Sequence, residues 1–525
     1  MLARIVNNKI IKLEQISQAE ENLIIKAFSV RNPKAMYIDM HGGSFDGWYR
    51  KYNSYRKVMS RALLGELREV CAVYRLPLTV VDDRPPAEYP APDPNSITKD
   101  LLSGIQLYDH QMRAIKAACR AEVGLIDIKV GGGKTDVAAG IAKIMNCPTV
   151  IICDQTIVIE QIKARLELRK VAEEVGLFCA GKRPNNQLIV VGLIQSLDYP
   201  VQPPAKVEDD TPESYAKKIK AFETRRKNAR VLQELVKKCD LLMVDEADKA
   251  SGPQFSKLFR HWFNGRRRYG FSGTCFDPAK PVQNLVLKER LGSVIAKASR
   301  AELEAINQII PVRYNMVVVG DPGMKYDRTV YDIAKKEQII DNKEFHLKVA
   351  GIAKHASRNE GDGVLILVED ITLGTALQEI IPGSVFIYGN TNSENRWNAI
   401  HAFERREIKV LIGGKIIKRG LDLKGGCESL IIATGGKMWS DFDQKVGRAI
   451  RKNKRGFSYV YDFFMMGNKY LYEHSKSRLK NIVAMGYRAN VVWGDKIITA
   501  RQFIKSKYRM PSQKQLDAKL HISNS

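Results

Sequence analysis

Residues 126–135 read Ile-Asp-Ile-Lys-Val-Gly-Gly-Gly-Lys-Thr, and helical periodicity follows over residues 137–144. Three consecutive glycines let backbone amides close around phosphate oxygens, because no Cβ atom stands in the way. The N-terminus of the helix behind the loop adds a dipole that favours an anion. A strand, a glycine loop and a helix in this order predict a phosphate-binding loop in an α/β lobe.

The loop contains the residues that we expect to hold a nucleotide. Lys134 would reach the β and γ phosphates, and the Thr135 hydroxyl would coordinate Mg²⁺. The other nucleotide-binding residues that we predict in the loop are Ile128, Lys129, Val130, Gly131, Gly132 and Gly133. Ile128 stands where the usual pattern begins with glycine, so the loop departs from that pattern at its first position.

An acidic strand end provides the second half of the expected site. Residues 241–248 read Leu-Leu-Met-Val-Asp-Glu-Ala-Asp, and the acidic motif itself is Asp245, Glu246, Ala247 and Asp248. Asp245 would hold Mg²⁺ through water, and Glu246 would orient and polarise the attacking water. Together with the phosphate-binding loop, this strand end predicts an ATPase that uses ATP and Mg²⁺.

Charge and cysteine usage narrow the class of protein. The net charge is +26, and an excess of this size attracts polyanions and speeds their encounter. Nucleic acid is therefore the expected partner, although net charge alone also fits a merely basic protein. The eight cysteines form no C-x-x-C pair, which argues against a zinc ribbon or a disulfide framework. No apolar run reaches the roughly 18 residues that span a bilayer, and we expect a cytoplasmic protein without a membrane partner.

Proline content and strand periodicity suggest the domain organisation. Five prolines within residues 81–95 predict a linker after a small α/β domain. Apolar runs then alternate with helices, which predicts two parallel-sheet α/β lobes. The strand candidates are residues 124–128, 149–153, 188–191, 241–244, 364–368, 385–388, 409–412 and 429–432. The expected parts are an N-terminal domain 1–85, a linker 86–99, lobes 100–310 and 311–475, and a basic extension 476–525.

A charged helical stretch at residues 201–232 interrupts the first lobe. A solvated insertion is the plainer interpretation, and an arm that faces nucleic acid is the alternative. The cations that such an arm would use are Lys217, Lys218, Lys220, Arg225, Arg226 and Lys227.

The order of motifs in the first lobe resembles that of superfamily-two helicases. Leu-Tyr-Asp-His-Gln at 107–111 is similar to the segment that reads adenine, which implies a hydrogen bond from Gln111 and stacking by Tyr108. Residues 154–161 resemble motif Ia, with Asp154 in place of its usual proline, and residues 192–197 resemble motif Ic. The resemblance implies nucleic-acid contacts by Gln161, Gln195 and Ser196. Ser-Gly-Thr at 272–274 resembles motif III.

Two motifs in the second lobe extend the resemblance. Residues 410–425 are similar to motif V, which implies that Gly420 and Asp422 face the nucleotide and Arg419 the nucleic acid; the family's threonine is Gly414 here. Residues 444–451 match the motif VI pattern Q-x-x-G-R-x-x-R. The resemblance assigns catalytic roles to Gln444, Arg448 and Arg451, with both arginines acting as fingers on the γ phosphate.

The resemblance implies two RecA-like lobes and a monomeric motor. Residues 43–67 are similar to the first domain of phage branched-DNA helicases of the UvsW type, which implies a DNA helicase of replication, recombination or repair. It would act on forked or branched DNA, in the host cytoplasm if phage-encoded. Trp48 and Tyr52 belong to an aromatic and basic segment that would stack on DNA, or else fill a strand core. An ATP-dependent RNA helicase is the alternative, followed by a nucleotide-gated scaffold and a restriction-enzyme motor subunit.

Overall fold

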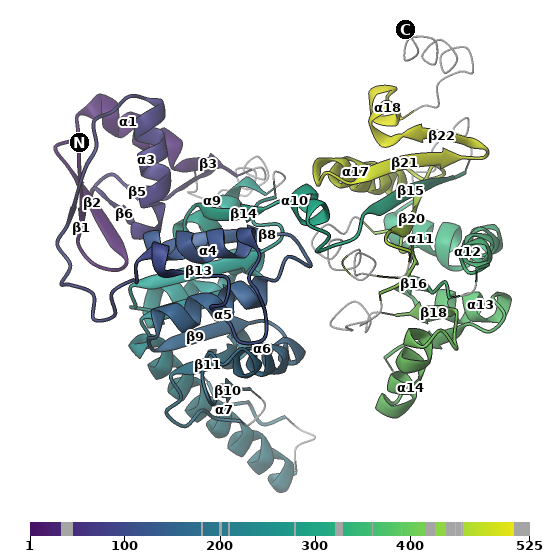
Figure 1. Cartoon of the computed structure of the whole chain (residues 1–525), viewed down its shortest axis with the longest axis horizontal. Helices are drawn as coiled ribbons and strands as arrows, with labels where there is room; N and C mark the ends of the chain where they lie inside the picture. Colours follow the sequence, from purple (N-terminus) through teal and green to yellow (C-terminus); the bar gives the residue numbers. More distant parts are fainter. Residues whose placement is uncertain are drawn as a thin grey trace. The chain divides into compact units, whose positions relative to one another are not determined.

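The computed structural model describes the chain except residues 33–45, 180–181, 199–201, 208–210, 278–279, 321–328, 360, 390, 415–425, 437–446, 448–452, 454 and 509–525. Two compact units divide it, Met1–Ser299 and Arg300–Ser525 (Figure 1). Each unit is described separately below. No helix among the described residues is both long and apolar enough to cross a bilayer.

The first unit begins with a small domain that has its own core. Its five-stranded sheet has the order β5-β6-β2-β1-β7, and Ile11, Leu13, Ile24 and Leu67 are among the buried side chains. The sheet strands are β1 (Leu2–Ile5), β2 (Ile10–Glu14), β5 (Tyr52–Asn53), β6 (Val58–Ser60) and β7 (Thr79–Asp82). The other elements are α1 (Gln18–Ala27), α3 (Leu64–Val73) and the hairpin of β3 (Ser29–Arg31) with β4 (Trp48–Arg50). Ser17 begins α1 with a capping box that it shares with Glu20, as this residue pair predicts.

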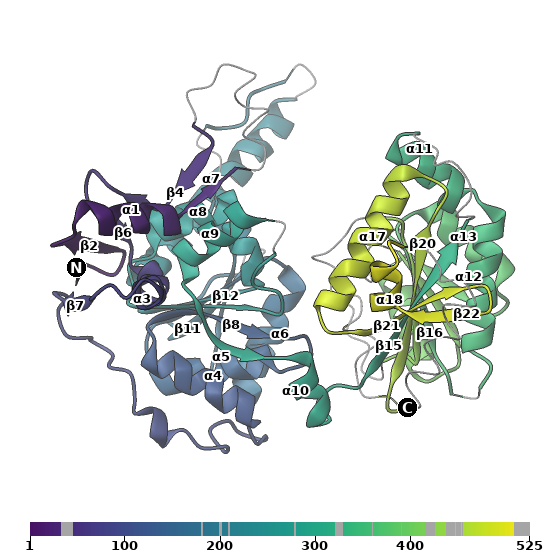
Figure 2. The same ribbon diagram turned by 90° about the horizontal axis from the view of Figure 1, so that it is seen from above.

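The first lobe is a parallel sheet of seven strands in the order β10-β11-β9-β12-β13-β8-β14. The strands are β8 (Val123–Ile128), β9 (Thr149–Cys153), β10 (Gly176–Phe178), β11 (Ile189–Leu193), β12 (Leu241–Asp245), β13 (Arg267–Ser272) and β14 (Val294–Ala298). The helices are α4 (Asp109–Arg120), α5 (Lys134–Met145), α6 (Thr156–Leu168), α7 (Pro212–Lys238), α8 (Pro253–Lys257) and α9 (Pro281–Leu291). Helices α4, α5 and α6 cover one face and α7, α8 and α9 the other (Figure 2), as expected for a buried parallel sheet.

The second unit repeats this architecture with eight strands in the order β17-β18-β16-β19-β20-β15-β21-β22. The strands are β15 (Val312–Val319), β16 (Val364–Val368), β17 (Val385–Ile387), β18 (Val410–Gly413), β19 (Ser429–Ala433), β20 (Ser458–Met465), β21 (Arg488–Trp493) and β22 (Lys496–Thr499). The helices are α10 (Arg300–Ala305), α11 (Tyr331–Lys335), α12 (Lys343–Ala356), α13 (Ile371–Ile380), α14 (Ser393–Glu404), α17 (Lys469–Ala484) and α18 (Ala500–Lys505). The two parallel-sheet lobes confirm the predicted α/β fold class.

Two expected boundaries differ from the structure. Within the expected basic extension, residues 488–499 are part of the second sheet, because β21 pairs in parallel with β15 and β22 pairs antiparallel with β21. In addition, α17 is anchored to the same sheet by a buried ion pair, in which Arg478 Nε lies 2.9 Å from Asp462 Oδ2. The first domain is likewise not held only by a linker, because it packs closely on the first lobe.

A buried cluster of charges joins the first domain to the first lobe. The carboxylate of Glu122, just before β8, forms ion pairs with three guanidinium groups. The N···O distances are 2.6 Å to Arg61, 2.8 Å to Arg84 and 2.5 Å to Arg266. Burial lowers the pKa of Arg61 to about 10, although Glu122 raises it. Gly65 of α3 lies so close to the first lobe that a Cβ atom there would be 2.8 Å from Ser293 Oγ. The contact is therefore tight as well as charged.

Candidate nucleotide and nucleic-acid site

The loop between β8 and α5 has the backbone of a phosphate-binding loop. Gly131 and Gly133 adopt φ angles of +86° and +79°, which glycine accepts without strain. The amide of Gly132 donates to the carbonyl of Lys129 at 3.0 Å, so the loop turns sharply before α5 begins at Lys134. A Cβ atom on Gly133 would overlap the Gln111 amide. These residues fit a phosphate group, because glycines and a helix N-terminus present backbone amides to it.

The acidic strand end lies in the electrostatic field of this loop. Desolvation raises the pKa of the Asp245 carboxyl, the neighbouring Glu246 raises it further, and Lys134 lowers it. Burial and Glu246 also raise the pKa of Asp248, to about 6. Carboxylates crowded in this way favour a cation. Lys134 is thus close enough to Asp245 to act on its charge.

The carboxylates suit Mg²⁺ bound mainly by water and phosphate oxygens. No group of three or more His, Cys, Asp or Glu side chains among the described residues could hold a metal. Mg²⁺ commonly keeps several waters and binds one or two carboxylates together with substrate phosphates. Asp245 and Thr135 fit that mode. Glu246 has φ +49°, a left-handed conformation that is uncommon outside glycine and is found at functional sites.

Two side chains of α4 contact the phosphate-binding loop. Gln111 Nε2 donates to the Gly132 carbonyl at 3.3 Å, and Gln111 Oε1 accepts from the Tyr108 amide at 3.0 Å. His110 Nε2 lies 2.9 Å from the same carbonyl and therefore donates to it. The Tyr108 ring stacks on His110, with the ring centroids 5.8 Å apart. His110 was not among the predicted site residues, although it lies within the quoted segment beside Gln111.

Motif III is tied to both halves of the site. Lys129 Nζ donates to the Gly273 carbonyl and lies 3.3 Å from Asp127 Oδ1. Ser272 Oγ donates to Asp248 Oδ1 at 3.0 Å. Lys129 therefore connects the phosphate-binding loop to the segment after β13, instead of extending free toward a nucleotide.

The residues expected to contact nucleic acid divide into exposed and buried ones. Gln161 and Gln195 are exposed, and Ser196 is half-buried. Gln195 Nε2 donates to the Asp154 carbonyl at 3.0 Å, which joins the segments that resemble motifs Ia and Ic. Trp48 is 42% exposed and fits the expected stacking surface.

Tyr52 corrects the expectation for the first domain. Its ring is 4% exposed, its hydroxyl donates to Glu21 Oε1 at 2.8 Å, and burial raises its pKa. Tyr52 therefore belongs to the core and cannot stack on DNA in this structure. The reason is the strand alternation, which turns successive side chains to opposite faces.

Six expected site residues lie outside the described part of the chain. They are Arg419, Gly420, Asp422, Gln444, Arg448 and Arg451. Their roles stay predictions that rest on the sequence motifs.

Comparisons with known proteins place these observations in a family. Residues 104–277 match a family model described as the res subunit of type III restriction enzymes, and residues 347–453 match the helicase conserved C-terminal domain. A curated relative is the pre-mRNA-splicing ATP-dependent RNA helicase PRP28 of Scheffersomyces stipitis, 22% identical over 238 residues, which are 43% of this chain and 48% of that protein. The match spans about half the length of that relative.

Two solved structures are among those similar to this chain. T4 UvsW is 14% identical with a TM-score of 0.43, and the match covers 94% of this chain and 99% of that one. S. cerevisiae Dbp5 bound to RNA and ADP BeF3 is 14% identical with a TM-score of 0.46, covering 75% and 91%. The two family matches fall one in each lobe and agree with the motif order and with the RecA-like fold. This chain belongs to the superfamily-two helicases.

Proposed function

We propose that this protein is an ATP-driven DNA translocase that unwinds or branch-migrates forked and branched DNA. The observation that carries the proposal is a chain of contacts in the first lobe. Gln195, an exposed residue of the segment that resembles motif Ic, donates to Asp154. Asp154 in turn pairs with Lys249, which directly follows the acidic motif. Gln195, which would contact nucleic acid, is thus linked to the residues that would bind the nucleotide.

The proposed chemistry assigns one task to each residue. Lys134 and the loop amides hold the phosphates, while Asp245 and Thr135 hold Mg²⁺, which would neutralise phosphate charge when bound. Glu246 orients the attacking water and accepts its proton. Gly420 and Asp422 would face the nucleotide, and Gln444, Arg448 and Arg451 would complete the catalytic arrangement. The arginine fingers stabilise charge that develops on the transferred phosphoryl group.

Grip on the nucleic acid would come mainly from its backbone. Gln161, Gln195, Ser196 and Arg419 would contact one strand, and Trp48 would stack on a base near a junction. Backbone contacts make binding salt-dependent and nearly independent of sequence. Forked or branched DNA is supported by the similarity of residues 43–67 to the first domain of UvsW-type helicases.

ATP hydrolysis and strand displacement on a panel of substrates test this proposal. Forked DNA and four-way junctions should stimulate hydrolysis more than linear single strands, and Trp48→Ala should reduce that preference. Single substitutions Arg448→Ala and Arg451→Ala should each slow hydrolysis by about 10³-fold with little loss of ATP affinity. ATP turnover without any response to DNA would reject the proposed function.

An RNA helicase is the second candidate, and the match to PRP28 favours it. The same motor motifs serve either nucleic acid, so the motifs do not discriminate between them. RNA duplexes with a single-stranded tail should therefore be included in the panel. Faster unwinding of the RNA duplex than of the matched DNA duplex would select this candidate.

A further inference from the structure

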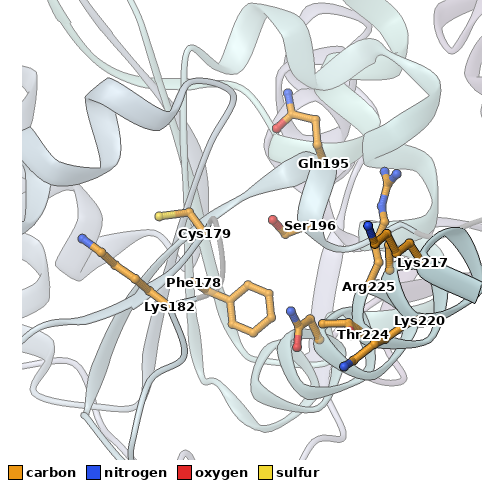
Figure 3. Close-up of a pocket in the computed structure, with 11 residues that line it drawn as sticks. Phe178, Cys179, Lys182, Gln195, Ser196, Lys217, Lys220, Thr224 and Arg225 are labelled. Atoms are coloured by element: carbon orange, nitrogen blue, oxygen red, sulfur yellow. The ribbon is translucent and has the colours of Figure 1, made fainter. Parts of the chain in front are cut away.

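A pocket of about 640 Å³ lies beside the segment that resembles motif Ic. Helix α7 forms one wall, the end of β10 forms the opposite wall, and Gln195 and Ser196 lie between them (Figure 3). None of its described lining residues is acidic, whereas four are cationic: Lys182, Lys217, Lys220 and Arg225. The pocket is therefore suited to an anion.

All the residues of α7 that line the pocket lie on one face of the helix. Helix α7 lines the pocket at positions that recur every three and four residues, namely Lys217, Lys220 with Ala221, Thr224 with Arg225, and Asn228. This spacing places them in one stripe along the helix. Lys217, Lys220 and Arg225 are exposed and make no ion pair with a described carboxylate. Lys182, on the other wall, pairs with Glu160 at 2.6 Å. The available positive charge thus comes from α7.

The inner part of the pocket offers groups of a different kind. Asn228 Oδ1 is buried and has no hydrogen-bond partner among the described residues. A buried acceptor without a hydrogen-bond partner destabilises the folded protein, so a ligand that donates a hydrogen bond to it would offset that penalty. Phe178 and Cys179 are almost completely buried and give the opposite wall an apolar surface. The pocket therefore combines cations at its rim with a polar acceptor and apolar atoms further in.

We propose that this pocket binds a nucleotide unit of a nucleic-acid single strand and that α7 is a second grip of the motor. Phosphates would contact Lys217, Lys220 and Arg225, and a base would donate to Asn228 against the apolar wall. The inference rests on the proposed function, because Gln195 and Ser196 belong both to the pocket and to the expected strand path. That continuity favours a nucleic acid over an acidic peptide, which would match only the charge.

A matched pair of variants of the full chain tests the inference. The pocket variant is Lys217→Gln, Lys220→Gln and Arg225→Gln. The control variant is Lys218→Gln, Arg226→Gln and Lys227→Gln, which removes the same charge from the same helix at residues that do not line the pocket. Fluorescence anisotropy with labelled oligo-dT at several salt concentrations measures affinity. The pocket variant should bind about tenfold more weakly, and its salt slope should fall by about 2, since each single-strand phosphate contact contributes about 0.7.

A third variant separates the pocket from charge alone. Asn228→Ala leaves every cation in place, so it should weaken oligo-dT binding while leaving the salt slope unchanged. Thermal unfolding of all variants checks that α7 still folds. Equal affinity loss in the pocket and control variants would overturn the inference, because only net charge would then matter. Preferential loss of poly-glutamate binding would overturn it in favour of an acidic peptide.

The outcomes also separate this inference from the proposed function. A wild-type protein that hydrolyses ATP without stimulation by oligo-dT or forked DNA would contradict the proposed function itself. Normal stimulation of the wild type, together with oligo-dT affinity of the pocket variant equal to that of the wild type, would reject only the second grip.

Discussion

The ammonium group of Lys249 lies 2.5 Å from Oδ2 of Asp154. Burial lowers the pKa of Lys249, but the hydrogen bond and charge of Asp154, together with the charges of Glu246 and Asp248, raise it by more, so the pKa lies above its ordinary value. Asp154 occupies the position where motif Ia usually has proline, and Lys249 follows the acidic motif directly. With aspartate at this position instead of proline, an ion pair connects the segment that resembles motif Ia to the residue after the acidic motif.

Disrupting this pair should weaken the response of the ATPase to DNA. Asp154→Ala, Lys249→Ala and the double variant should lower the ratio of DNA-stimulated to unstimulated hydrolysis by similar factors, because each removes the same link. Residues in contact commonly show coupling energies of about 0.5–3 kcal/mol. Steady-state ATPase assays with and without DNA measure the ratio. Losses that add in the double variant would show that the two residues act independently.

Lys134→Ala should abolish ATP hydrolysis and strand displacement while DNA binding stays close to that of the wild type. The reason is that Lys134 begins α5 beside the phosphate-binding loop and acts on Asp245, and it is not among the residues expected to contact nucleic acid. Hydrolysis and anisotropy assays on one preparation give both quantities. ATP turnover at the wild-type rate would show that the nucleotide site lies elsewhere.

Glu246→Gln should bind ATP but turn it over slowly. The amide keeps the size of the side chain but cannot accept a proton from water, and loss of a general base typically costs about 10²- to 10⁴-fold in rate. Single-turnover hydrolysis separates this step from product release. Asp248→Asn is the comparison, since Asp248 bonds to Ser272 and is not assigned to the attacking water. Normal single-turnover rates for Glu246→Gln would assign the base to another residue.

Asp245→Asn should stabilise the ligand-free protein at neutral pH while abolishing hydrolysis. The pKa of Asp245 is raised in the folded state, so the folded protein holds this proton more tightly than the unfolded chain does. The free energy of unfolding therefore decreases as pH rises above about 4, the ordinary pKa of an aspartate. Near neutral pH the whole destabilising effect of the charged Asp245 is present. The first thermal transition should rise at about pH 8 and show no gain at about pH 4. An equal gain at both would contradict a charge-based cause.

Glu122→Ala should destabilise the first unit by about 3 kcal/mol, because it leaves the buried Arg61 without a carboxylate partner. Arg61 has 5% of its side chain exposed and loses its ion pair. Chemical denaturation measures the free energy of unfolding. The control is Glu234→Ala, which removes a solvent-exposed ion pair with Lys237 and should leave the free energy of unfolding nearly unchanged. By the same reasoning, residues 100–525 alone should unfold at a lower temperature than the whole chain.

The sequence predicted the inner strands of both sheets well. Residues 124–128, 149–153 and 364–368 coincide with β8, β9 and β16 to within a residue. Buried parallel strands are continuous apolar runs, so they are visible without periodicity. Strand β13 was not anticipated, because it begins with Arg267, whose charge is satisfied by Asp240 at 2.6 Å. That pairing joins residues far apart in the chain and leaves no local signal.

In the candidate site, too, features set by local sequence were predictable, and those set by contacts between distant residues were not. The proximity of Lys134 to Asp245 was predicted, since the carboxyl ends of parallel strands share one edge of the sheet. The burial of Tyr52 was not predicted. Segment 45–56 contains both exposed and core aromatic residues, and strand register decides which of them face the core. His110 was missed because its partner is a backbone carbonyl, which no residue pattern reveals.

The contact between the first domain and the first lobe has a consequence for biosynthesis. Ser60 Oγ donates to the carbonyl of Glu289, a residue 229 positions later in the chain. At about 5–20 residues per second, the ribosome adds that partner roughly 10–50 s after Ser60 itself. During this interval the nascent domain exposes Arg61 and the face of α3 to water and to other chains. Assembly of the first unit is thus completed late, once β14 closes the edge of its sheet.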